Sequence, residues 1–405
     1  VAAVGGGTGA SITFGAGAGA TTFNGTVRTT SGFSQDGTAG LVTFVDDVNV
    51  IDGDTASTFN ANVTLDGLTF TTARAVTFGS DGADTVTLST SDVTVTATSA
   101  GADGAVTFNS VVDGAVGLTV NSDGTTTFDA VVGPTVTFVT TDAGGTTAIN
   151  GGTITTTGAQ TYNDDVTIGA DPTTLTSSGD ADITLAKTTT GAVALTVNTG
   201  GDTTFGGGVT VNSLTTDDDA SVGAGEQTFI NGPFVTTTGD QLYNDAVAIG
   251  GGDVAPIGTL TTLTGVNVTF NGTLDADATG MNRNLSIIAS GITTFGDAPA
   301  DFVGGAGRFE SVTTDAAGTT VIETSTFNAD GASITFNDPV ILGTDVTVDE
   351  DGTGNVTFES TVDSDGTPRD LTVNTASGQT IFRGIVGGVS PLDVLTTDAT
   401  GTTLI

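Results

Sequence analysis

The stretch LTVNSDGTTTF, residues Leu118–Phe128, contains two short runs of alternating residues on either side of a turn. In the first run, Leu118 and Val120 alternate with polar residues, so one side of an extended strand is apolar and the other polar. Ser, Asp and Gly then supply turn chemistry, and TTTF begins a second strand-like run. The stretch therefore predicts short β-strands that face a core on one side and water on the other.

This stretch recurs three times, and we name it the Leu phrase. The copies are LTVNTGGDTTF from Leu195, a diverged LSIIASGITTF from Leu285, and LTVNTASGQTIF from Leu371. Their starts lie 77, 90 and 86 residues apart. Self-similarity at such spacings is typical of repeat architectures, in which each unit buries its apolar face against its neighbours.

Three further phrases recur in a constant order with the Leu phrase. The Thr-Thr-Asp phrase occurs as VTTDAGGTTAI (Val139–Ile149), LTTDDDASVGAGEQTFI (Leu214–Ile230), VTTDAAGTTVI (Val312–Ile322) and LTTDATGTTLI (Leu395–Ile405). The aromatic-Asn-Asp phrase occurs as TTTGAQTYNDDVTIG (Thr155–Gly169), TTTGDQLYNDAVAIG (Thr236–Gly250) and NADGASITFNDPVILG (Asn328–Gly343). Each unit opens with a fourth phrase: VTFNSVV from Val106, ITLAKTT from Ile183, VTFNGTL from Val268 and VTFESTV from Val356.

The order of the phrases predicts the domain organisation. Three repeat modules span residues 106–182, 183–267 and 268–355, and an incomplete module spans 356–405. Residues 1–105 have a similar texture and are interpreted as diverged repeats. Because the last Thr-Thr-Asp phrase stops without the residues that follow its earlier copies, we expect related coils beyond Ile405, from the same chain or a neighbouring copy.

Two all-β architectures accommodate modules of 80–90 residues. One is a parallel β-solenoid, in which each module forms several coils of one winding. The alternative is a series of tandem immunoglobulin-like β-sandwiches. The strand-like runs are short and start 8 to 14 residues apart in the first module, and the chain has no Trp and only eight Pro. These features favour the solenoid, with coils of about 20 residues and Phe128 and Phe205 in its core.

The charge is strongly acidic, with 46 acidic and seven basic residues and a formal net charge of −39. Asp supplies 41 of the acids and Glu only five, and Asp is favoured in turns because its short side chain can bond nearby backbone. This charge argues against nucleic acid as a partner. No apolar run is long enough for a transmembrane helix, and the absence of Cys excludes disulfides.

Catalytic chemistry has few candidate residues in this chain. There is no His and no Cys, and Lys187 is the only Lys, so most general bases and nucleophiles are missing. We therefore predict no enzyme activity and no catalytic residues. Rows of Thr suggest ice binding as an alternative function, but their spacing is irregular, and the β-propensity of Thr explains why it faces outward on strands.

Calcium is the one cofactor that the sequence suggests. Half of a calcium-binding β-roll pattern occurs in DGADTVTL, and acids gather in TTDDDAS and VTVDEDGTG. Hard cations bind several oxygen ligands, which such turns can provide. The candidate metal ligands are Asp81, Asp84, Asp217, Asp218, Asp219, Asp349 and Asp351.

The ordered phrases LTVNT, LTTDA and TTTG-QTYND resemble the repeat arrays of large secreted bacterial proteins, the filamentous-haemagglutinin-like and autotransporter-type adhesins. The resemblance covers about residues 106–405. It implies a secreted β-solenoid at the cell surface, with no catalytic residues to transfer.

These observations predict a structural extracellular protein that forms part of a long fibre, filament or adhesin stalk. The alternative is an adhesin module that contacts a receptor or polysaccharide, with calcium as a stabilising ion. The expected partners are further repeats or copies of the chain end to end, and surface glycans or receptors under the alternative.

Overall fold

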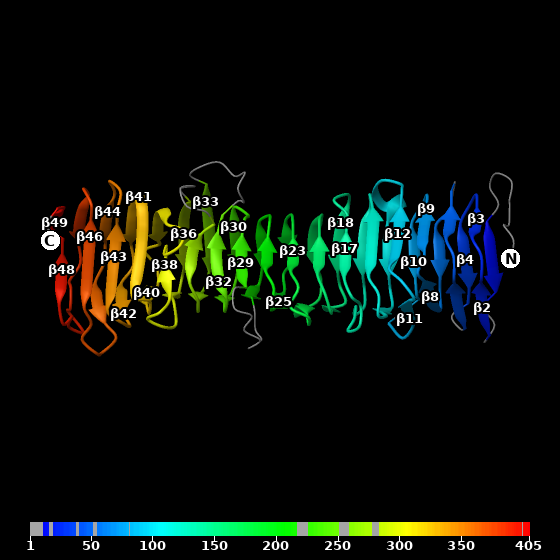
Figure 1. The fold of residues 1–405 in the computed structure, drawn as a ribbon, viewed down its shortest axis with the longest axis horizontal. Coiled ribbons are helices and arrows are strands. Elements are labelled where there is room, and N and C mark those ends of the chain that lie inside the picture. The colour runs from blue at the N-terminus through cyan, green and yellow to red at the C-terminus, as the bar shows by residue number, and fades with distance from the viewer. Residues whose placement is uncertain are drawn as a thin grey trace. The chain divides into compact units, whose positions relative to one another are not determined.

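The computed structural model describes residues 11–15, 19–37, 40–51, 55–80, 82–216, 226–250, 259–277, 283–398 and 400–405. The fold is an all-β parallel β-solenoid of about 16 turns (Figure 1). Every strand pair among the described residues is parallel, whereas immunoglobulin-like sandwiches are antiparallel, so the solenoid prediction is confirmed and the sandwich alternative is wrong. The chain divides into two compact units, Val1–Asp202 and Thr203–Ile405.

Three series of parallel strands form three faces in the first unit. Face 1 consists of β1 (Ile12–Gly15), β4 (Phe33–Asp36), β7 (Ser57–Phe59), β10 (Val76–Phe78), β13 (Val106–Phe108), β16 (Thr125–Phe128), β18 (Thr146–Ile149), β21 (Asp165–Ile168) and β24 (Thr189–Thr190). Face 2 consists of β3 (Val27–Thr29), β6 (Val48–Val50), β9 (Thr69–Thr72), β12 (Val93–Ala97), β15 (Leu118–Ser122), β17 (Val139–Thr141), β20 (Gln160–Tyr162) and β23 (Ile183–Leu185). Face 3 consists of β2 (Ala20–Phe23), β5 (Leu41–Phe44), β8 (Asn62–Asp66), β11 (Thr85–Ser89), β14 (Val111–Asp113), a bridge at Val132, β19 (Thr153–Thr156), β22 (Thr173–Ser177) and β25 (Ala194–Thr199).

The second unit has the same three-sided construction, with faces that we label a, b and c. Face a consists of β27 (Val209–Val211), β30 (Phe234–Thr237), β33 (Leu260–Gly265), β36 (Arg283–Ala289), β39 (Phe309–Thr314), the second half of β41 (Thr326–Phe336), β44 (Asn355–Phe358), β47 (Gln379–Phe382) and β49 (Thr402–Leu404). Face b consists of β26 (Thr203–Phe205), β29 (Gln227–Ile230), β32 (Ala246–Ile249), β35 (Leu274–Ala276), β38 (Phe302–Val303), the first half of β41, β43 (Val346–Glu350), β46 (Leu371–Thr375) and β48 (Leu395–Thr397). Face c consists of β28 (Ser213–Thr216), β31 (Gln241–Tyr243), β34 (Val268–Phe270), β37 (Ile292–Phe295), β40 (Thr319–Ile322), β42 (Val340–Leu342), β45 (Val362–Ser364) and a bridge at Val386.

One turn of the solenoid contains three strand segments, and its length varies. Val106 pairs with Thr126, twenty residues on, while Val76 pairs with Val106, thirty residues on. The only helix among the described residues is the short 3-10 helix η1 (Gly101–Gly104). It lies in the loop between β12 and β13, within the thirty-residue turn. Some turns match the expected coil of about 20 residues and others are longer, because the corner loops differ in length while the strands stay short.

The alternation predicted from the Leu phrase is present in the strands. Strand β15 buries Leu118, Val120 and Ser122 and leaves the residues between them partly exposed. Aromatic rings stack inside each unit, as in Phe108 on Phe128 with ring centroids 5.4 Å apart. Phe128 and Phe205 are 0% and 1% exposed, which confirms the prediction that both are core residues.

Counted over the described residues, the sequence repeat spans eleven strand segments, which is not a whole number of three-strand turns. In the second unit, the Thr-Thr-Asp phrases begin at β28, β39 and β48. Eleven segments separate each start from the next, when β41 is counted once for each face and the Val386 bridge as one segment. Each copy consequently starts on a different face, first c, then a, then b. The number of residues between successive copies varies, but the number of strand segments between them is constant.

Asp side chains at the corners connect consecutive turns. Asp92 Oδ1 accepts a hydrogen bond from the Gly117 backbone N–H at 2.8 Å in the first unit. Asp345 Oδ1 accepts from the Asp370 N–H at 3.0 Å in the second. The sequence predicted that Asp would bond its own turn, and the structure adds that many of these bonds run to the turn above. A corner Asp therefore contributes to stacking as well as to local geometry.

Truncation of a core ring should destabilise the turns around it. Phe128→Ala and Phe205→Ala should each lower the free energy of unfolding by about 3 to 5 kcal/mol, because they remove a fully buried ring and leave a cavity. Hydrogen exchange by mass spectrometry should show the loss in the turns next to the substitution. Val131→Ala, at a position that is 39% exposed, provides the control. Equal protection in the core variants and the control would contradict the assignment.

Candidate functional site

A buried carboxylate joins two turns at one corner of the first unit. Asp164 follows β20 in the turn before β21 and is 1% exposed. Its Oδ1 accepts hydrogen bonds from the hydroxyls of Thr141 at 2.9 Å and Thr147 at 2.8 Å, and Thr147 Oγ1 also lies 2.9 Å from Oδ2. Both threonines belong to the Thr-Thr-Asp phrase of the preceding turn. We name this arrangement the Asp–Thr tie.

The second unit contains two further Asp–Thr ties. Asp245 accepts from Thr216 at 3.1 Å and from Thr228 at 2.9 Å. Asp338 accepts from Thr314 at 2.7 Å and from Thr320 at 2.9 Å. The two carboxylates are 8% and 2% exposed. All three ties therefore join a Thr-Thr-Asp phrase to the aromatic-Asn-Asp phrase of the next turn.

The Asn that precedes each of these aspartates adds a bond to the same threonine. Asn163 Nδ2 donates to the Thr141 carbonyl at 2.8 Å. The equivalent distances are 3.2 Å from Asn244 to the Thr216 carbonyl and 2.6 Å from Asn337 to the Thr314 carbonyl. One Thr of each pair is thus bound at its hydroxyl by the Asp and at its carbonyl by the Asn, which leaves the corner little freedom.

Burial raises the pKa of Asp164, Asp245 and Asp338 above the ordinary value, and the Thr hydroxyls offset only part of this effect. The charged form of each carboxylate is therefore costly in the folded chain. These groups have little access to solvent, and their oxygens are occupied by hydroxyl donors. The arrangement is suited to holding turns together.

A buried Gln–Tyr pair accompanies two of the three ties. Tyr162 donates its hydroxyl to Gln160 Oε1 at 3.0 Å, and Gln160 Nε2 donates to the Thr176 carbonyl at 2.8 Å. Tyr243 and Gln241 repeat this geometry at 2.9 Å. In the third copy the equivalent residues are Ile334 and Phe336, both buried. The polar pair is replaced as a unit by an apolar pair, so neither position leaves a buried side-chain polar group without its partner.

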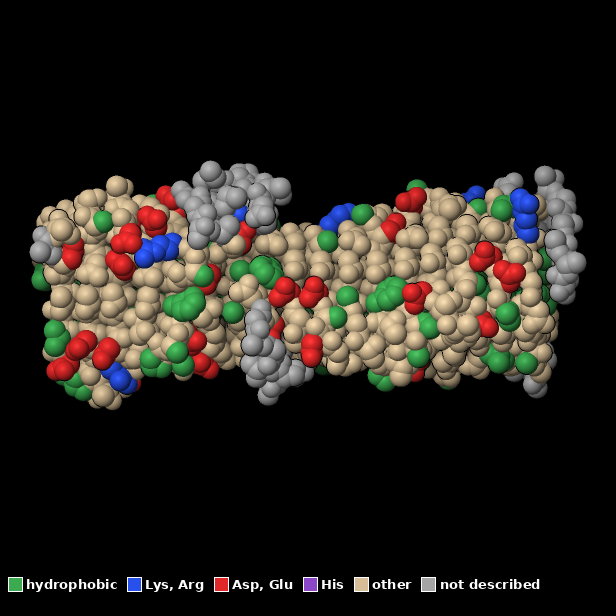
Figure 2. Space-filling view, in the orientation of Figure 1, with side chains coloured by type: hydrophobic (Ala, Val, Ile, Leu, Met, Phe, Trp, Pro, Cys, Tyr) green, Lys and Arg blue, Asp and Glu red, His purple; other side chains and the backbone are tan. Residues whose placement is uncertain are grey.

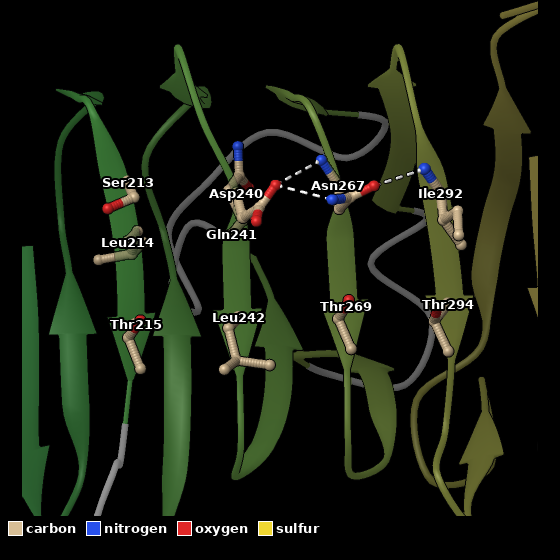
Figure 3. Close-up of a pocket in the computed structure, with 10 residues that line it drawn as sticks. All are labelled: Ser213, Leu214, Thr215, Asp240, Gln241, Leu242, Asn267, Thr269, Ile292 and Thr294. Atoms are coloured by element: carbon tan, nitrogen blue, oxygen red, sulfur yellow. Dashed lines mark hydrogen bonds between the residues drawn. The ribbon is translucent and has the colours of Figure 1, made fainter. Parts of the chain in front are cut away.

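A shallow groove of about 540 Å³ crosses face c of the second unit (Figure 3). Residues of four consecutive strands of face c and of the turns that precede two of them line the groove: Ser213, Leu214, Thr215, Asp240, Gln241, Leu242, Asn267, Thr269, Ile292 and Thr294. Leu214 and Gln241 are buried at its floor. Asp240 Oδ1 accepts from Asn267 Nδ2 at 2.8 Å, and Asn267 Oδ1 accepts from the Ile292 N–H at 2.8 Å. These bonds hold one edge of the groove rigid.

The lining of this groove is neutral and hydroxyl-rich except for Asp240. It offers Thr and Ser hydroxyls beside the apolar Leu242 and Ile292, and none of the ten lining residues is aromatic or basic. Such a surface can donate and accept hydrogen bonds with an uncharged linear ligand. It provides no platform for stacking a ring and no counter-charge for an anion.

Of the predicted calcium ligands that the structure describes, Asp349 and Asp351 come together and Asp84 lies apart from them. Asp84 Oδ2 accepts from the Ser80 hydroxyl at 3.0 Å and therefore acts as a turn residue. Asp349 and Asp351 lie close to each other, and Asp351 forms an ion pair with Arg308. Burial, together with the neighbouring Asp351 carboxylate, raises the pKa of Asp349. The intervening Glu350 is fully buried and points into the core.

The remaining predicted ligands, Asp81, Asp217, Asp218 and Asp219, lie outside the described residues. Within the described part of the chain, no group of three or more acidic side chains is placed to hold a metal ion. Calcium binding therefore stays a prediction for the acidic turns.

Acidic side chains are scattered over the surface of each unit among uncharged polar residues, as Figure 2 shows for one side. Basic side chains are few, and several pair with a nearby acid, such as Arg369 with Asp365 at 2.7 Å. Across the described residues, no helix has the length and apolar character needed to cross a membrane.

Sequence reasoning did not identify the Asp–Thr ties. Asp164, Asp245 and Asp338 were interpreted with the other aspartates as turn residues. A signal is present, because each aromatic-Asn-Asp phrase follows a Thr-Thr-Asp phrase in which the second and the last Thr are the two that bind the Asp. Comparison of the chain with protein-family models, curated proteins and solved structures gives no match.

The raised pKa values predict that stability increases as pH falls from neutral. The folded-state pKa of Asp164, Asp245 and Asp338 lies above the unfolded value of 3.8, so the folded chain takes up more protons between those values. Each site should add at most about 1.4 kcal/mol per pH unit within that window, and the gain should end near pH 3.8. Thermal unfolding between pH 3 and 7 measures the effect.

Adjacent substitutions separate this effect from general charge repulsion. Asp164→Asn should reduce the pH dependence above pH 3.8 by the share of one site, because the amide does not titrate, while Asp245 and Asp338 still contribute. The Thr188 hydroxyl lowers the pKa of Asp165, so the stability that the Asp165 carboxylate contributes is lost only below pH 3.8. Asp165→Asn should therefore leave the profile above that pH unchanged. Identical profiles for the two variants would contradict the role of the buried carboxylate.

The Gln–Tyr pair should behave as a coupled unit. Gln160→Ile leaves the Tyr162 hydroxyl buried without its acceptor and should cost about 1 to 3 kcal/mol. The double variant Gln160→Ile/Tyr162→Phe copies the third repeat and should recover most of that loss. A double-mutant cycle from denaturant unfolding gives the coupling energy, and strictly additive effects would show that the pair is not coupled.

Proposed function

We propose that this chain is a structural section of an extracellular solenoid, part of a fibre, filament or adhesin stalk at a bacterial surface. The observation that carries the proposal is the mismatch between the eleven-segment repeat and the three-segment turn. It places copies of one phrase on faces c, a and b of the second unit in succession. A protein that binds a regular ligand along one face would be expected to repeat its features on that face.

The interior also supports a scaffold role. The Asp–Thr ties, the stacked rings and the corner Asp bonds all run between turns, so they oppose separation of one turn from the next. The net charge of −39 disfavours lateral association of copies. An extended section that resists stretching and stays separate from its neighbours fits a stalk. The resemblance of the phrases to secreted bacterial repeat proteins supports the cell-surface location.

A second function, contact with a surface polysaccharide, is favoured by the groove on face c. Its hydroxyl groups and its apolar Leu242 and Ile292 match the mixed surface of an uncharged sugar chain. This would make the second unit an adhesin module as well as a spacer.

Immunogold electron microscopy of the native source material tests the scaffold proposal. Antibodies against the folded chain should label filaments or stalks along their length outside the cell. Label confined to the cytoplasm would contradict the proposal. Glycan-array binding tests the second function, and Thr269→Ala/Thr294→Ala in the groove should abolish any signal that Thr119→Ala, an outward Thr of the first unit, retains.

A further inference from the structure

A further cavity, of about 250 Å³, lies on face b of the second unit. Outward residues of three consecutive strands line it: Phe229 from β29, Ala248 from β32 and Asp275 from β35. Strands β29 and β32 lie side by side (Figure 1), and the register pairs Phe229 with Ala248 and Ala248 with Asp275. An aromatic ring, a methyl group and a carboxylate therefore form one row across the strands.

The small side chain of Ala248 leaves the middle of this row open and forms the floor of the cavity, where it is 4% exposed. Neighbouring strands are about 4.8 Å apart, so the Phe229 and Asp275 positions are separated by about 10 Å along the row. The single methyl group between them fills little of that distance. A ligand in the cavity can therefore contact the ring on one side and the carboxylate on the other.

Backbone donors hold the Asp275 side chain in place. Its Oδ1 accepts hydrogen bonds from the N–H groups of Ala306 at 3.0 Å and Gly307 at 3.2 Å. Asp275 is buried, and this burial raises its pKa, although the backbone N–H groups offset part of the effect. A carboxylate has about four lone-pair sites, so a ligand in the cavity can bind the same group. A cationic ligand would also compensate for the burial of the negative charge.

A second carboxylate at the cavity, that of Asp277, is already neutralised. Arg283 Nε lies 2.8 Å from Asp277 Oδ1, and Arg283 Nη2 lies 3.0 Å from Oδ2. This ion pair is almost fully buried. Asp275 is therefore the charged group that the described lining offers to a ligand.

The row lies in the second copies of three phrases, and the other two copies differ from it. The equivalent residues are Ala148, Thr167 and Thr190 in the first copy and Val321, Ile341 and Asp363 in the third. Asp363 repeats the Asp275 geometry, because its Oδ1 accepts from the Val389 and Ser390 N–H groups at 2.8 and 3.1 Å. In that row Ile341 occupies the middle position. The bound carboxylate is thus shared by two repeats, whereas the open row beside an aromatic ring is particular to one.

The chemistry of the cavity selects the kind of cation. A calcium-type ion needs several oxygen ligands, which one available carboxylate beside an aromatic ring does not supply. A guanidinium group binds a carboxylate through both oxygens, but Asp275 Oδ1 already has two backbone donors. An ammonium group needs a single oxygen and is attracted to an aromatic ring. The net charge of −39 also attracts cationic ligands to this chain.

We propose that this cavity on face b is a binding site for an alkylammonium group, held between the Asp275 carboxylate and the Phe229 ring above Ala248. A free aliphatic amine and the lysine side chain of a partner protein both present this group. The inference goes beyond the proposed function, because a scaffold does not require a ligand at this position.

Two probes separate the sources of the group: n-butylammonium, and lysine with its backbone blocked as Nα-acetyl-lysine amide. Titration of the full chain, followed by ligand-observed NMR, should give saturable binding. Tighter binding of n-butylammonium would assign the site to a free amine, and tighter binding of the lysine derivative to a protein side chain. The neutral analogue 1-butanol should not bind. Saturable binding of neither amine, or equal binding of 1-butanol, would overturn the proposal.

Removal of the carboxylate charge tests the role of Asp275. Asp275→Asn keeps an acceptor for the backbone donors and removes the charge, so it should weaken binding about tenfold or more. Asp363→Asn is the matched control, because it removes the same charge at the equivalent position of the third copy and should bind like the unaltered protein. Equal weakening in both variants would show that only the net charge of the chain matters and would overturn the proposal.

Ala248→Ile tests the open row, since it copies the residue of the third repeat. The larger side chain should fill the space between Phe229 and Asp275 and abolish binding. Thr167→Ile, at the equivalent position of the first unit, is the control and should leave binding unchanged. Unchanged binding by folded Ala248→Ile would contradict the site. Phe229→Leu removes the ring, keeps an apolar side chain and should weaken binding severalfold, which tests the site even where Ala248→Ile does not fold.

Discussion

Burial of each turn by the next is the interaction on which the rest of this structure depends. A single turn has three short strands, and their apolar residues face a core that no one turn can close. Backbone hydrogen bonds, ring stacks and corner Asp bonds all connect neighbouring turns. Stability is therefore distributed along the chain, as in other repeat proteins, with contributions from contacts between adjacent turns. Loop length between strands can vary, because strand pairing and ring stacking are made by residues of the strands.

The eleven-segment repeat has a structural consequence beyond the distribution of phrases over the faces. If the repeat were a whole number of turns, the equivalent residues of every copy would lie on the same face. Here unlike phrases stack: the Leu phrase contacts the Thr-Thr-Asp phrase, as in Leu285 with Val312 and Leu371 with Leu395. The Thr-Thr-Asp phrase in turn lies beneath the aromatic-Asn-Asp phrase. The constant order of phrases in the sequence is the order in which complementary turns must follow one another.

The solenoid, its strand alternation and its Phe core could be predicted because each depends on local pattern. Leu118, Val120 and Phe128 show their environment within one stretch of eleven residues. The Asp–Thr tie could not be derived in the same way, since Thr141 and Thr147 lie in different strands and their acceptor comes 23 residues after the first. The ion pair of Arg283 with Asp277, 2.8 Å between Nε and Oδ1 and almost fully buried, likewise has no local signal in the sequence. The acidic run VTVDEDGTG did not show that strand alternation directs Glu350 inward between Asp349 and Asp351.

A buried carboxylate is an expensive way to hold two turns together, and burial raises the pKa of all three tie aspartates. Well-packed apolar residues often give as much stability as a buried charged group, so stability alone does not account for the ties. Register does. Unlike phrases must stack in one order, and strands with similar Val, Thr and Phe patterns could pair in several ways. A turn displaced by one strand segment would place its Asp against apolar residues, without the two hydroxyls. An Asp buried without those hydroxyls is costly, so the Thr pair at each corner favours the turn that carries the Asp.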